Sequence, residues 1–388
     1  EDLRLEDYKN FEPDAYSEHT DENGVLQLNL QTSLELAARY SREYQSSKES
    51  LYSSALSLLS ESDEWDWNPV NNFNALWGIK QKPSSSTLST DSGLGIRKRF
   101  FSGARLSAGF GLQTLRYLSG DKSHSLLSLA NINITQPLLA GYGADIGRET
   151  LTQAERNLVY ALRTYIRTRE ALLINIAERY YAVLNAKESL EIGKQTYASV
   201  AASLERSEAM ADAGRVDPFQ VDQARQKVLT AESNLVSLEE NYQNAIDLLK
   251  TVLGMPLDVS IDADPDDLTK LTQQDLPVPP MSFEEAIETA LDNRLDFATV
   301  KDRLDDQNRK LKVAEDALKG KLDLVLGADA QSKRSNSLHL MRFADSSYTA
   351  GLNVELPLHK EKELIQYKRQ LISLQQQHRE INKSRDGI

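Results

Sequence analysis

The sequence feature that most restricts the fold is an apolar heptad that runs from residue 221 to residue 252. A strict period of 3.5 residues predicts a helix that packs along one narrow seam, as in a left-handed coiled coil. Gly254 and Pro256 predict the end of that helix. The ten members of the heptad are Val221, Ala224, Val228, Ala231, Leu235, Leu238, Tyr242, Ala245, Leu249 and Val252.

A second helical pattern, from residue 145 to residue 213, comes before this heptad and is separated from it by a short break. Asp217 is a good helix N-cap and Pro218 suits the first helical position, so the second helix is predicted to begin there. We therefore expect residues 145–213 and 218–253 to form an antiparallel helical hairpin. The break between them consists of Gly214, Arg215, Val216, Asp217 and Pro218.

Residues 65–137 change to a period of two, which predicts β-strands. Leu106 and Phe110 would lie on one face of a strand, and Ser107 on the other. The run KPSSSTLSTDSG, at 82–93, predicts a loop by its composition. The alternation returns at 322–331 and 348–356. In the second of these, Leu352, Val354 and Leu356 oppose Asn353 and Glu355.

The junction between strand and helix occurs twice. ANINITQPLLAGYG, at 130–143, and AGLNVELPLHKEKE, at 350–363, both alternate apolar and polar residues, reach a proline and continue as a helical pattern. Proline ends a strand and fits a first helical turn. The helices that precede the strands also align, with Leu34 matching Ile287 at an offset of 253 (287 − 34). We predict an internal duplication of a helix, strands and a helix.

The duplication divides the chain into repeats of an α+β, mostly α, fold. Residues 1–30 form an N-terminal extension, and a connector at 256–282 separates the repeats. The first repeat, 31–255, comprises a helix at 31–64, a β segment at 65–137 and a helical hairpin at 138–255. The second, 283–388, comprises a helix at 283–320, a β segment at 321–358 and a helix at 359–388.

The second repeat lacks a returning helix, so we expect the native protein to continue beyond residue 388 with a second hairpin. We also expect the apolar seam of 359–388 to lack a packing partner. Its members include Leu364, Tyr367, Leu371 and Leu374.

Composition excludes several functions. A net charge of −13 argues against a nucleic-acid partner, which rewards clusters of Lys and Arg. The absence of cysteine excludes thiolate metal sites and a cysteine nucleophile. The five histidines show no ligand spacing, and GFGLQT at 109–114 matches a phosphate loop only in part. We therefore predict neither an enzyme nor a cofactor or metal site. Hydropathy predicts no transmembrane helix, a test that a membrane β-barrel also passes.

The strands and the helices both need partners from other chains. Four clear strands cannot close a barrel, because single-chain membrane barrels begin at about eight strands. A narrow apolar seam also cannot bury a long helix within one domain. Both features predict a ring of several chains, in which the strands close one barrel and the helices close another.

The sequence resembles the TolC-like outer-membrane efflux family over about 31–388. The resemblance rests on four segments. They are 135–184, beginning TQPLLAGYGADIGRET; 213–258, beginning AGRVDPFQVDQARQKV; 286–297, AIETALDNRLDF; and 351–358, GLNVELPL.

This resemblance implies a trimeric duct in the cell outer membrane for efflux or type I secretion. Each subunit would give four strands to a twelve-stranded barrel and its helices to a periplasmic tunnel. Implied partners are a periplasmic adaptor protein, an inner-membrane pump of the resistance-nodulation-division or ABC type, and outer-membrane lipid. The β segment is longer than two strands require, which leaves the role of 65–118 open. The turn at Gly214, Arg215, Val216, Asp217 and Pro218 aligns with the periplasmic tip, where the family meets its adaptor; without that role it is a capped hairpin turn.

Two alternatives remain open at the level of sequence. One is a periplasmic adaptor, a membrane fusion protein that also contains a coiled-coil hairpin. The other is a soluble coiled-coil scaffold, which would leave the alternating strands unexplained. Trp65, Trp67 and Trp77 fit either an aromatic belt at a lipid interface or ordinary packing.

Overall fold

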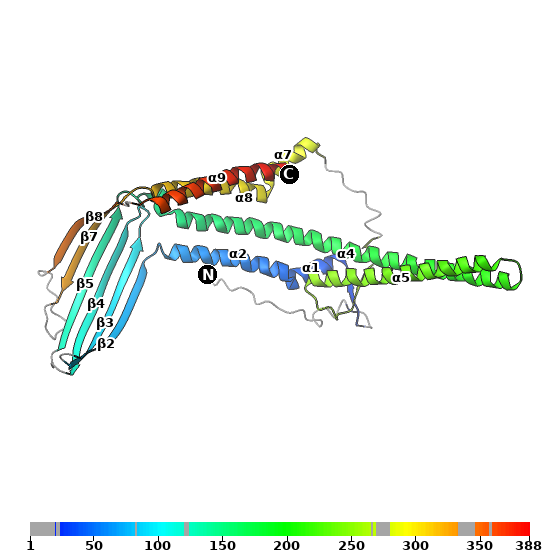
Figure 1. Cartoon of the computed structure of the whole chain (residues 1–388), viewed down its shortest axis with the longest axis horizontal. Helices are drawn as coiled ribbons and strands as arrows, with labels where there is room; N and C mark the ends of the chain where they lie inside the picture. The colour runs from blue at the N-terminus through cyan, green and yellow to red at the C-terminus, as the bar shows by residue number, and fades with distance from the viewer. Residues whose placement is uncertain are drawn as a thin grey trace. The chain divides into compact units, whose positions relative to one another are not determined.

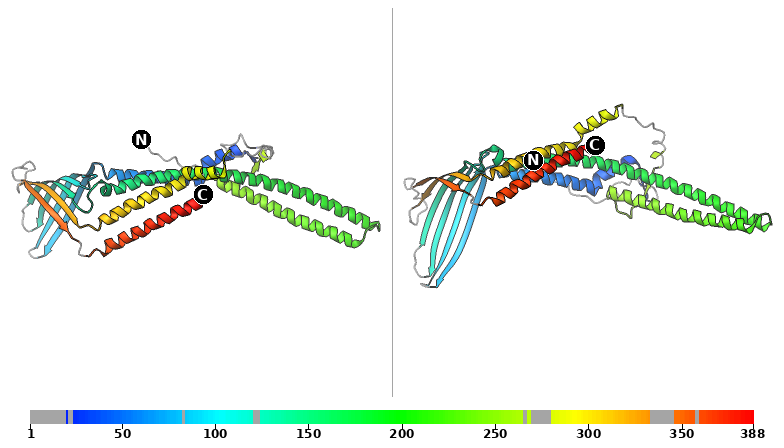
Figure 2. Two further views of the ribbon diagram at one scale, coloured as in Figure 1. Left: turned by 90° about the horizontal axis from the view of Figure 1, so that it is seen from above. Right: turned by 45° about the horizontal axis from the view of Figure 1, so that its top comes forward.

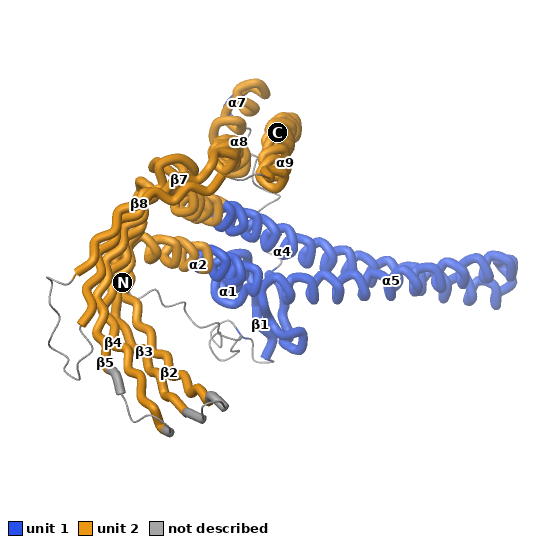
Figure 3. The backbone as a smooth tube through the Cα atoms, turned by 60° about the vertical axis from the view of Figure 1, so that its left-hand side comes forward, with its two compact units in different colours: residues 1–52, 164–281 blue, residues 53–163, 282–388 orange. Residues whose placement is uncertain are grey.

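A computed structural model describes residues 20, 24–81, 84–119, 124–264, 267–268, 280–332, 346–356 and 359–388. The chain forms two compact units, coloured separately in Figure 3. The first unit comprises residues 1–52 and 164–281, and the second comprises 53–163 and 282–388. Because the chain passes from one unit to the other within helices, α2 (Arg42–Asp63) and α4 (Glu149–Asp212) each contribute to both.

The first unit is built on a helical hairpin and a small parallel sheet. Most of α4 and all of α5 (Pro218–Leu253) form the hairpin, and the two arms lie side by side in every view (Figure 2). β1 (Leu26–Leu28) pairs in parallel with β6 (Ile261–Ala263), and α1 (Leu30–Tyr40) follows β1. These elements enclose one apolar core, which includes the fully buried side chains of Leu28, Leu36, Ile176, Tyr180, Leu249 and Leu253.

The hydroxyl group of Tyr180 makes hydrogen bonds at the polar edge of this core. The Tyr180 hydroxyl donates to Asp267, at 2.9 Å, and to the backbone carbonyl of Leu28, at 3.3 Å. The same Asp267 carboxylate accepts a hydrogen bond from the backbone N–H of Leu30, at 3.3 Å. Burial, with the hydrogen bond to Asp267, raises the pKa of Tyr180 well above its ordinary value, so the hydroxyl keeps its proton. One side chain of α4 thereby joins β1 to Asp267, in the segment that follows β6.

The second unit is built on one antiparallel sheet, drawn in Figure 1. Its order is β2 (Asn68–Gln81), β3 (Ser84–Arg99), β4 (Arg105–Ser119), β5 (His124–Pro137), β7 (Lys321–Gln331) and β8 (Ser347–Glu355). α2 leads into β2, and β5 leads into α3 (Ala144–Gly147) and then α4. α8 (Leu295–Asp316) leads into β7, and β8 leads into α9 (Glu361–Asp386). All four connections leave one end of the sheet, which we call the base.

The two repeats match element by element. α1 and α7 (Phe283–Asn293) begin 253 residues apart (283 − 30), as do α2 and α8 (295 − 42). The expected single helices at 31–64 and 283–320 are therefore wrong, because each breaks at the same place. Ser41 and Arg294 both adopt extended backbone, with φ −63° and ψ 119° at Ser41 and φ −67° and ψ 119° at Arg294. The expected helix at 145–213 also breaks, at Arg148 between α3 and α4.

The described sheet has six strands, where the sequence predicted four from each chain. The first repeat supplies β2 to β5 and the second supplies β7 and β8. The predicted loop at 82–93 is wrong over 84–93, which belong to β3. Strand formation prevails over composition here, because β3 is paired on both sides, with β2 and β4.

Three further expectations change. The predicted extension, 1–30, contains β1, and the predicted connector, 256–282, contains β6; residues 1–19 and 269–279 lie outside the described part. α9 has a neighbour in α8, to which Gln370 and Gln377 donate hydrogen bonds, at the Gln307 side chain (2.5 Å) and the Val300 carbonyl (2.9 Å). In the predicted seam, Tyr367, Leu371 and Leu374 are half-buried, while Leu364 is 42% exposed. Within the described residues, no helix combines the length and the apolar character needed to cross a membrane.

Candidate functional site

The turn of the helical hairpin is built from two matched caps. Gly214 has a left-handed φ of 71°, and its N–H donates to Ala211, at 2.8 Å, while the Arg215 N–H donates to Met210, at 2.9 Å. This pair of bonds is a Schellman motif, which satisfies the last carbonyls of α4. Asp217 then caps α5 by accepting from the Phe219 N–H, at 2.8 Å, as the sequence predicted.

The five predicted tip residues lie together at the end of the hairpin, and all are exposed except the half-buried Val216. The structure adds two apolar side chains that sequence reasoning missed. Phe219 is 66% exposed and Met210 is 44% exposed. The sequence carried a signal for Phe219. This apolar residue lies in the first turn of α5 and outside the heptad that begins at Val221, so it is not part of the packed seam. The tip therefore combines polar turn groups with exposed apolar surface.

The heptad seam joins the two arms. Every member from Val221 to Val252 is buried or half-buried, while most of the intervening positions are exposed. Gly193 of α4 faces this seam, because a Cβ there would lie 2.5 Å from the Leu238 side chain. On another side of α5, Leu229 and Val236 are exposed and seven residues apart. The hairpin thus has one filled seam and a second, exposed apolar row.

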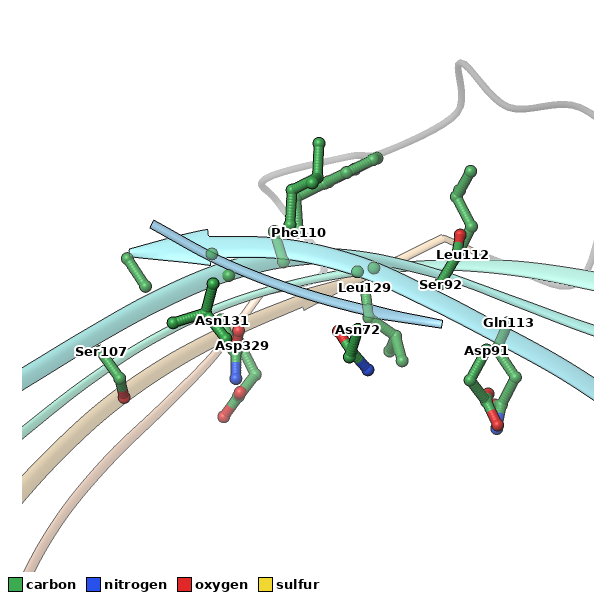
Figure 4. A pocket seen from close by; sticks show the side chains of 18 of the residues that line it. Asn72, Asp91, Ser92, Ser107, Phe110, Leu112, Gln113, Leu129, Asn131 and Asp329 are labelled. Atoms are coloured by element: carbon green, nitrogen blue, oxygen red, sulfur yellow. The ribbon is translucent and has the colours of Figure 1, made fainter. Parts of the chain in front are cut away.

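The sheet has two chemically different faces. Its register places Ile96, Ala108, Ile132 and Ala328 in one row, and Gly95, Gly109, Asn131 and Asp329 in the next. At the second repeat, Leu352 lies opposite Leu324, Val354 opposite Leu322, and Asn353 opposite Asp323. The predicted alternation is therefore confirmed across the sheet. Figure 4 shows both directions: Phe110 and Leu112 leave one face, while Asn72, Asp91, Ser107, Gln113, Asn131 and Asp329 leave the other.

The polar face forms a hollow of about 820 Å³ over the middle of the sheet. Small residues make room for the amides that line it, since a Cβ on Gly109 would lie 2.7 Å from the Asn131 side-chain oxygen. The described residues contain no group of three or more potential metal-ligating side chains. The hollow is open to solvent.

Below the base of the sheet, an ionic cluster joins α4 to α8. The Asp306 side chain is only 3% exposed, and it contacts the guanidinium groups of Arg156 and Arg309. The Tyr160 hydroxyl donates to it at 2.7 Å. Arg163 pairs with Asp302 at 2.6 Å, and Arg309 with Glu149 at 2.9 Å.

The cluster sets the charge of its members. Burial alone would raise the pKa of Asp306, but the hydrogen bonds from Tyr160 and Arg309 and the charge of Arg156 hold it below the ordinary value of 3.8. Burial and the hydrogen bond to Asp306 raise the pKa of Tyr160 to about 12. Asp306 is therefore a carboxylate and Tyr160 a neutral donor near neutral pH.

The three tryptophans differ. Trp65 is buried and stacks on Phe101, with ring centroids 5.3 Å apart, so it packs as a core residue. Trp67 and Trp77 are 56% and 68% exposed. Only these two remain available for an interfacial belt.

Comparisons with known proteins agree with this architecture. A family model described as "Outer membrane efflux protein" matches residues 97–255. The crystal structures of CusC share 14% identity and a TM-score of 0.61, over 95% of this chain and 74% of theirs. The CmeC outer membrane channel of Campylobacter jejuni shares 14% identity and a TM-score of 0.59, over 99% of this chain and 72% of its own. The outer membrane protein VceC of Vibrio cholerae shares 15% identity and a TM-score of 0.58, over 92% of this chain and 74% of its own. No curated protein matches the chain in sequence.

The chain shares the fold of these outer-membrane channels over 95% and 99% of its length for CusC and CmeC. In sequence, residues 97–255 match the outer membrane efflux protein family.

Proposed function

We propose that the chain is one subunit of a passive outer-membrane duct, a homotrimer through which a tripartite efflux or type I secretion system exports its cargo. It performs no chemistry. The sheet crosses the outer membrane, and the helices form a periplasmic tunnel. The domain boundaries of the repeats would then mark where the chain passes from membrane to periplasm, with β segments at 65–137 and 321–358.

The open edges of the sheet support assembly with other copies. β2 and β8 are the edge strands of the described sheet, with 14 and 9 residues. Each presents a row of backbone groups without a neighbouring strand in the described chain, and open edges do not occur in lipid. β8 of one copy pairing with β2 of the next would close a ring. The exposed row of Leu229 and Val236 offers a similar contact between the helices of adjacent copies.

The apolar face of the sheet supports contact with outer-membrane lipid. The strands have 9 to 16 residues, enough to cross a bilayer, which takes about 9 to 11 residues per tilted strand. Trp67 and Trp77 are ten residues apart (77 − 67). Along an extended chain at about 3.3 Å per residue, ten residues approach the thickness of the hydrocarbon core, so these side chains fit the two interfaces.

The exposed hairpin tip supports a contact with a periplasmic adaptor. Gly214, Arg215, Val216, Asp217 and Pro218 would form the contact, with Phe219 and Met210 as its apolar part. An inner-membrane pump of the resistance-nodulation-division or ABC type would supply the energy, because the duct itself has no energy source. The duplicated helix–strand–helix unit favours the duct over the adaptor and over the soluble scaffold.

The two-faced sheet is the observation that carries the proposal, and a pair of adjacent substitutions in β8 tests it. Leu352→Arg would put a charge on the lipid face near the middle of β8, at a cost of about 2–4 kcal/mol at mid-membrane. Asn353→Arg would put the same charge on the lumenal face. We expect only Leu352→Arg to abolish the heat-resistant migration of the assembled protein in detergent gels.

Asn353→Arg is the matched control, since it adds the same side chain one residue away. Equal loss of assembly in both variants would contradict the assignment of the two faces. Equal tolerance would argue that the sheet does not enter lipid.

A further inference from the structure

Two stacked rings lie between two arginines at the base of the sheet. The Arg99 guanidinium lies 4.8 Å from the centre of the Trp65 ring, and Trp65 stacks on Phe101. Arg148 lies on Phe101 in turn, at 5.3 Å. Trp65 is 6% exposed, so the stack holds its indole rigidly. Its indole N–H has no acceptor within the described residues.

Arginines gather beside this stack, on the polar face. Arg99 and Arg105 are direct cross-strand neighbours, and Arg97 lies two residues before Arg99 on the same face. Like charges placed directly opposite each other destabilise a sheet. Glu64 pairs with Arg99 at 2.8 Å, and no described carboxylate lies within 4 Å of Arg97 or Arg105. Two arginines thus lie side by side in a chain with a net charge of −13.

A hollow of about 470 Å³ opens between these groups and the start of the helices. Trp65, Arg99 and Arg105 line one part of it, and Lys321, held by Glu355 at 3.0 Å, and Asp323 line another. Its apolar lining comes from Phe100, Pro137, Ala140 and Ile146. This volume lies in the range of sites for drug-sized ligands, about 300–1,000 Å³.

We propose that this hollow binds an organic anion, a solute that carries a carboxylate, sulfonate or phosphate on an apolar body. Arg105 and Arg99 bind the oxyanion and Trp65 donates its indole N–H, while the apolar lining holds the body of the solute. A bound anion also relieves the repulsion between the two arginines. The role of the site as a selective station for cargo rests on the proposed function, but binding itself does not.

The test is calorimetric titration of the purified full chain in a non-ionic detergent. Naphthalene-2-sulfonate is the probe, and 2-naphthylmethylammonium is the cationic control of similar size. We expect the sulfonate alone to bind, and to bind more weakly as ionic strength rises. Arg105→Gln should lower the affinity about tenfold, since hydrogen bonds to charged groups are the stronger kind.

Two variants separate the site from general effects. Arg116→Gln makes the same change in the same strand, at an exposed position outside the hollow, and should leave binding unchanged. Trp65→Phe keeps a stacked ring but removes the N–H, and should weaken binding about threefold to tenfold. Equal binding of the two probes, or an unchanged affinity in Arg105→Gln, would overturn the proposal. Binding by a chain that exports nothing would instead leave the site standing and count against the duct.

Discussion

At the scale of single residues, the helices of the second unit depend on one buried carboxylate. Asp306 receives hydrogen bonds from Tyr160 and Arg309 and contacts Arg156. Such a group is costly to desolvate, and it is stabilised by the two arginines that contact it, which also pair with Asp302 and Glu149. The cluster therefore fixes the position of α8 on α4 more than it adds to net stability.

Asp306→Asn should lower the stability of the chain by about 3 kcal/mol, since it removes the most buried carboxylate of the cluster and leaves Arg156 and Arg309 with one carboxylate each. Thermal unfolding followed by far-ultraviolet circular dichroism measures the change. Asp305→Asn is the control, because this substitution removes the same charge one residue earlier, at an exposed position. Similar losses of stability in the two variants would show that the ionic cluster does not hold α8 on α4.

Tyr160→Phe should move acid unfolding to higher pH. Asp306 has a pKa below 3.8 in the folded chain, so its contribution to stability is present above that value and disappears as the pH falls through the folded pKa. Removing the Tyr160 hydroxyl takes away one bond that lowers this pKa, and the loss begins earlier. Helical signal recorded during acid titration gives the midpoint. A midpoint unchanged from that of the parent chain would contradict the assigned role of Tyr160.

At the scale of elements, the two ends of the hairpin helices use the same motif in different surroundings. Gly254 ends α5 with φ 78° and the Schellman bonds that Gly214 makes at the tip. A Cβ on Gly254 would overlap the backbone carbonyl of Tyr40, at the end of α1, whereas a Cβ on Gly214 would meet no atom within 4 Å. One glycine serves only the turn, and the other also permits close packing against α1.

Gly214→Ala should therefore cost about 1 kcal/mol, the usual penalty for a left-handed residue with a Cβ. Gly254→Ala should cost clearly more, because it adds a clash with backbone that cannot move aside easily. Denaturant titration of the two variants compares them directly. If Gly254→Ala is no worse than Gly214→Ala, the contact between α5 and α1 is looser than the structure shows.

The sequence predicted those elements whose signal is local. The heptad and the Asp217 and Pro218 pair predicted α5 and the end of α4 to within a residue, whereas α4 begins four residues after the predicted start. Alternation identified both faces of the sheet. The breaks at Ser41 and Arg294 carry no glycine or proline, so no local signal marks them. Residues 84–93 of β3 were predicted as a loop, because the backbone hydrogen bonds to β2 and β4 stabilise this polar stretch and its side chains give no strand signal. The arginines of the base could be seen in the sequence, but their grouping depends on strand register.

At the scale of the whole molecule, the count of strands decides the width of the proposed pore. Three copies of the described six-stranded sheet would give 18 strands (3 × 6). The resemblance implied twelve. Barrel diameter grows roughly in proportion to strand number, so the ring would be about one and a half times as wide.

Reconstituted into planar bilayers, the assembled chain should conduct roughly twice as well as a twelve-stranded channel of the same length, because conductance follows the area of the pore. Native mass spectrometry in detergent provides the number of subunits in the same preparation. A trimer with the conductance of a twelve-stranded channel would mean that β2 and β3 do not join the ring.

The unequal repeats have a consequence for how such ducts diversify. The first repeat places four strands where the second places two, and both still begin and end at the base of the sheet. A hairpin can be gained or lost there without disturbing the helices, because both of its ends lie at one edge of the membrane. In a threefold ring each such event counts three times. In the proposed trimer, the bore would therefore change in steps of six strands, while the helices keep their arrangement.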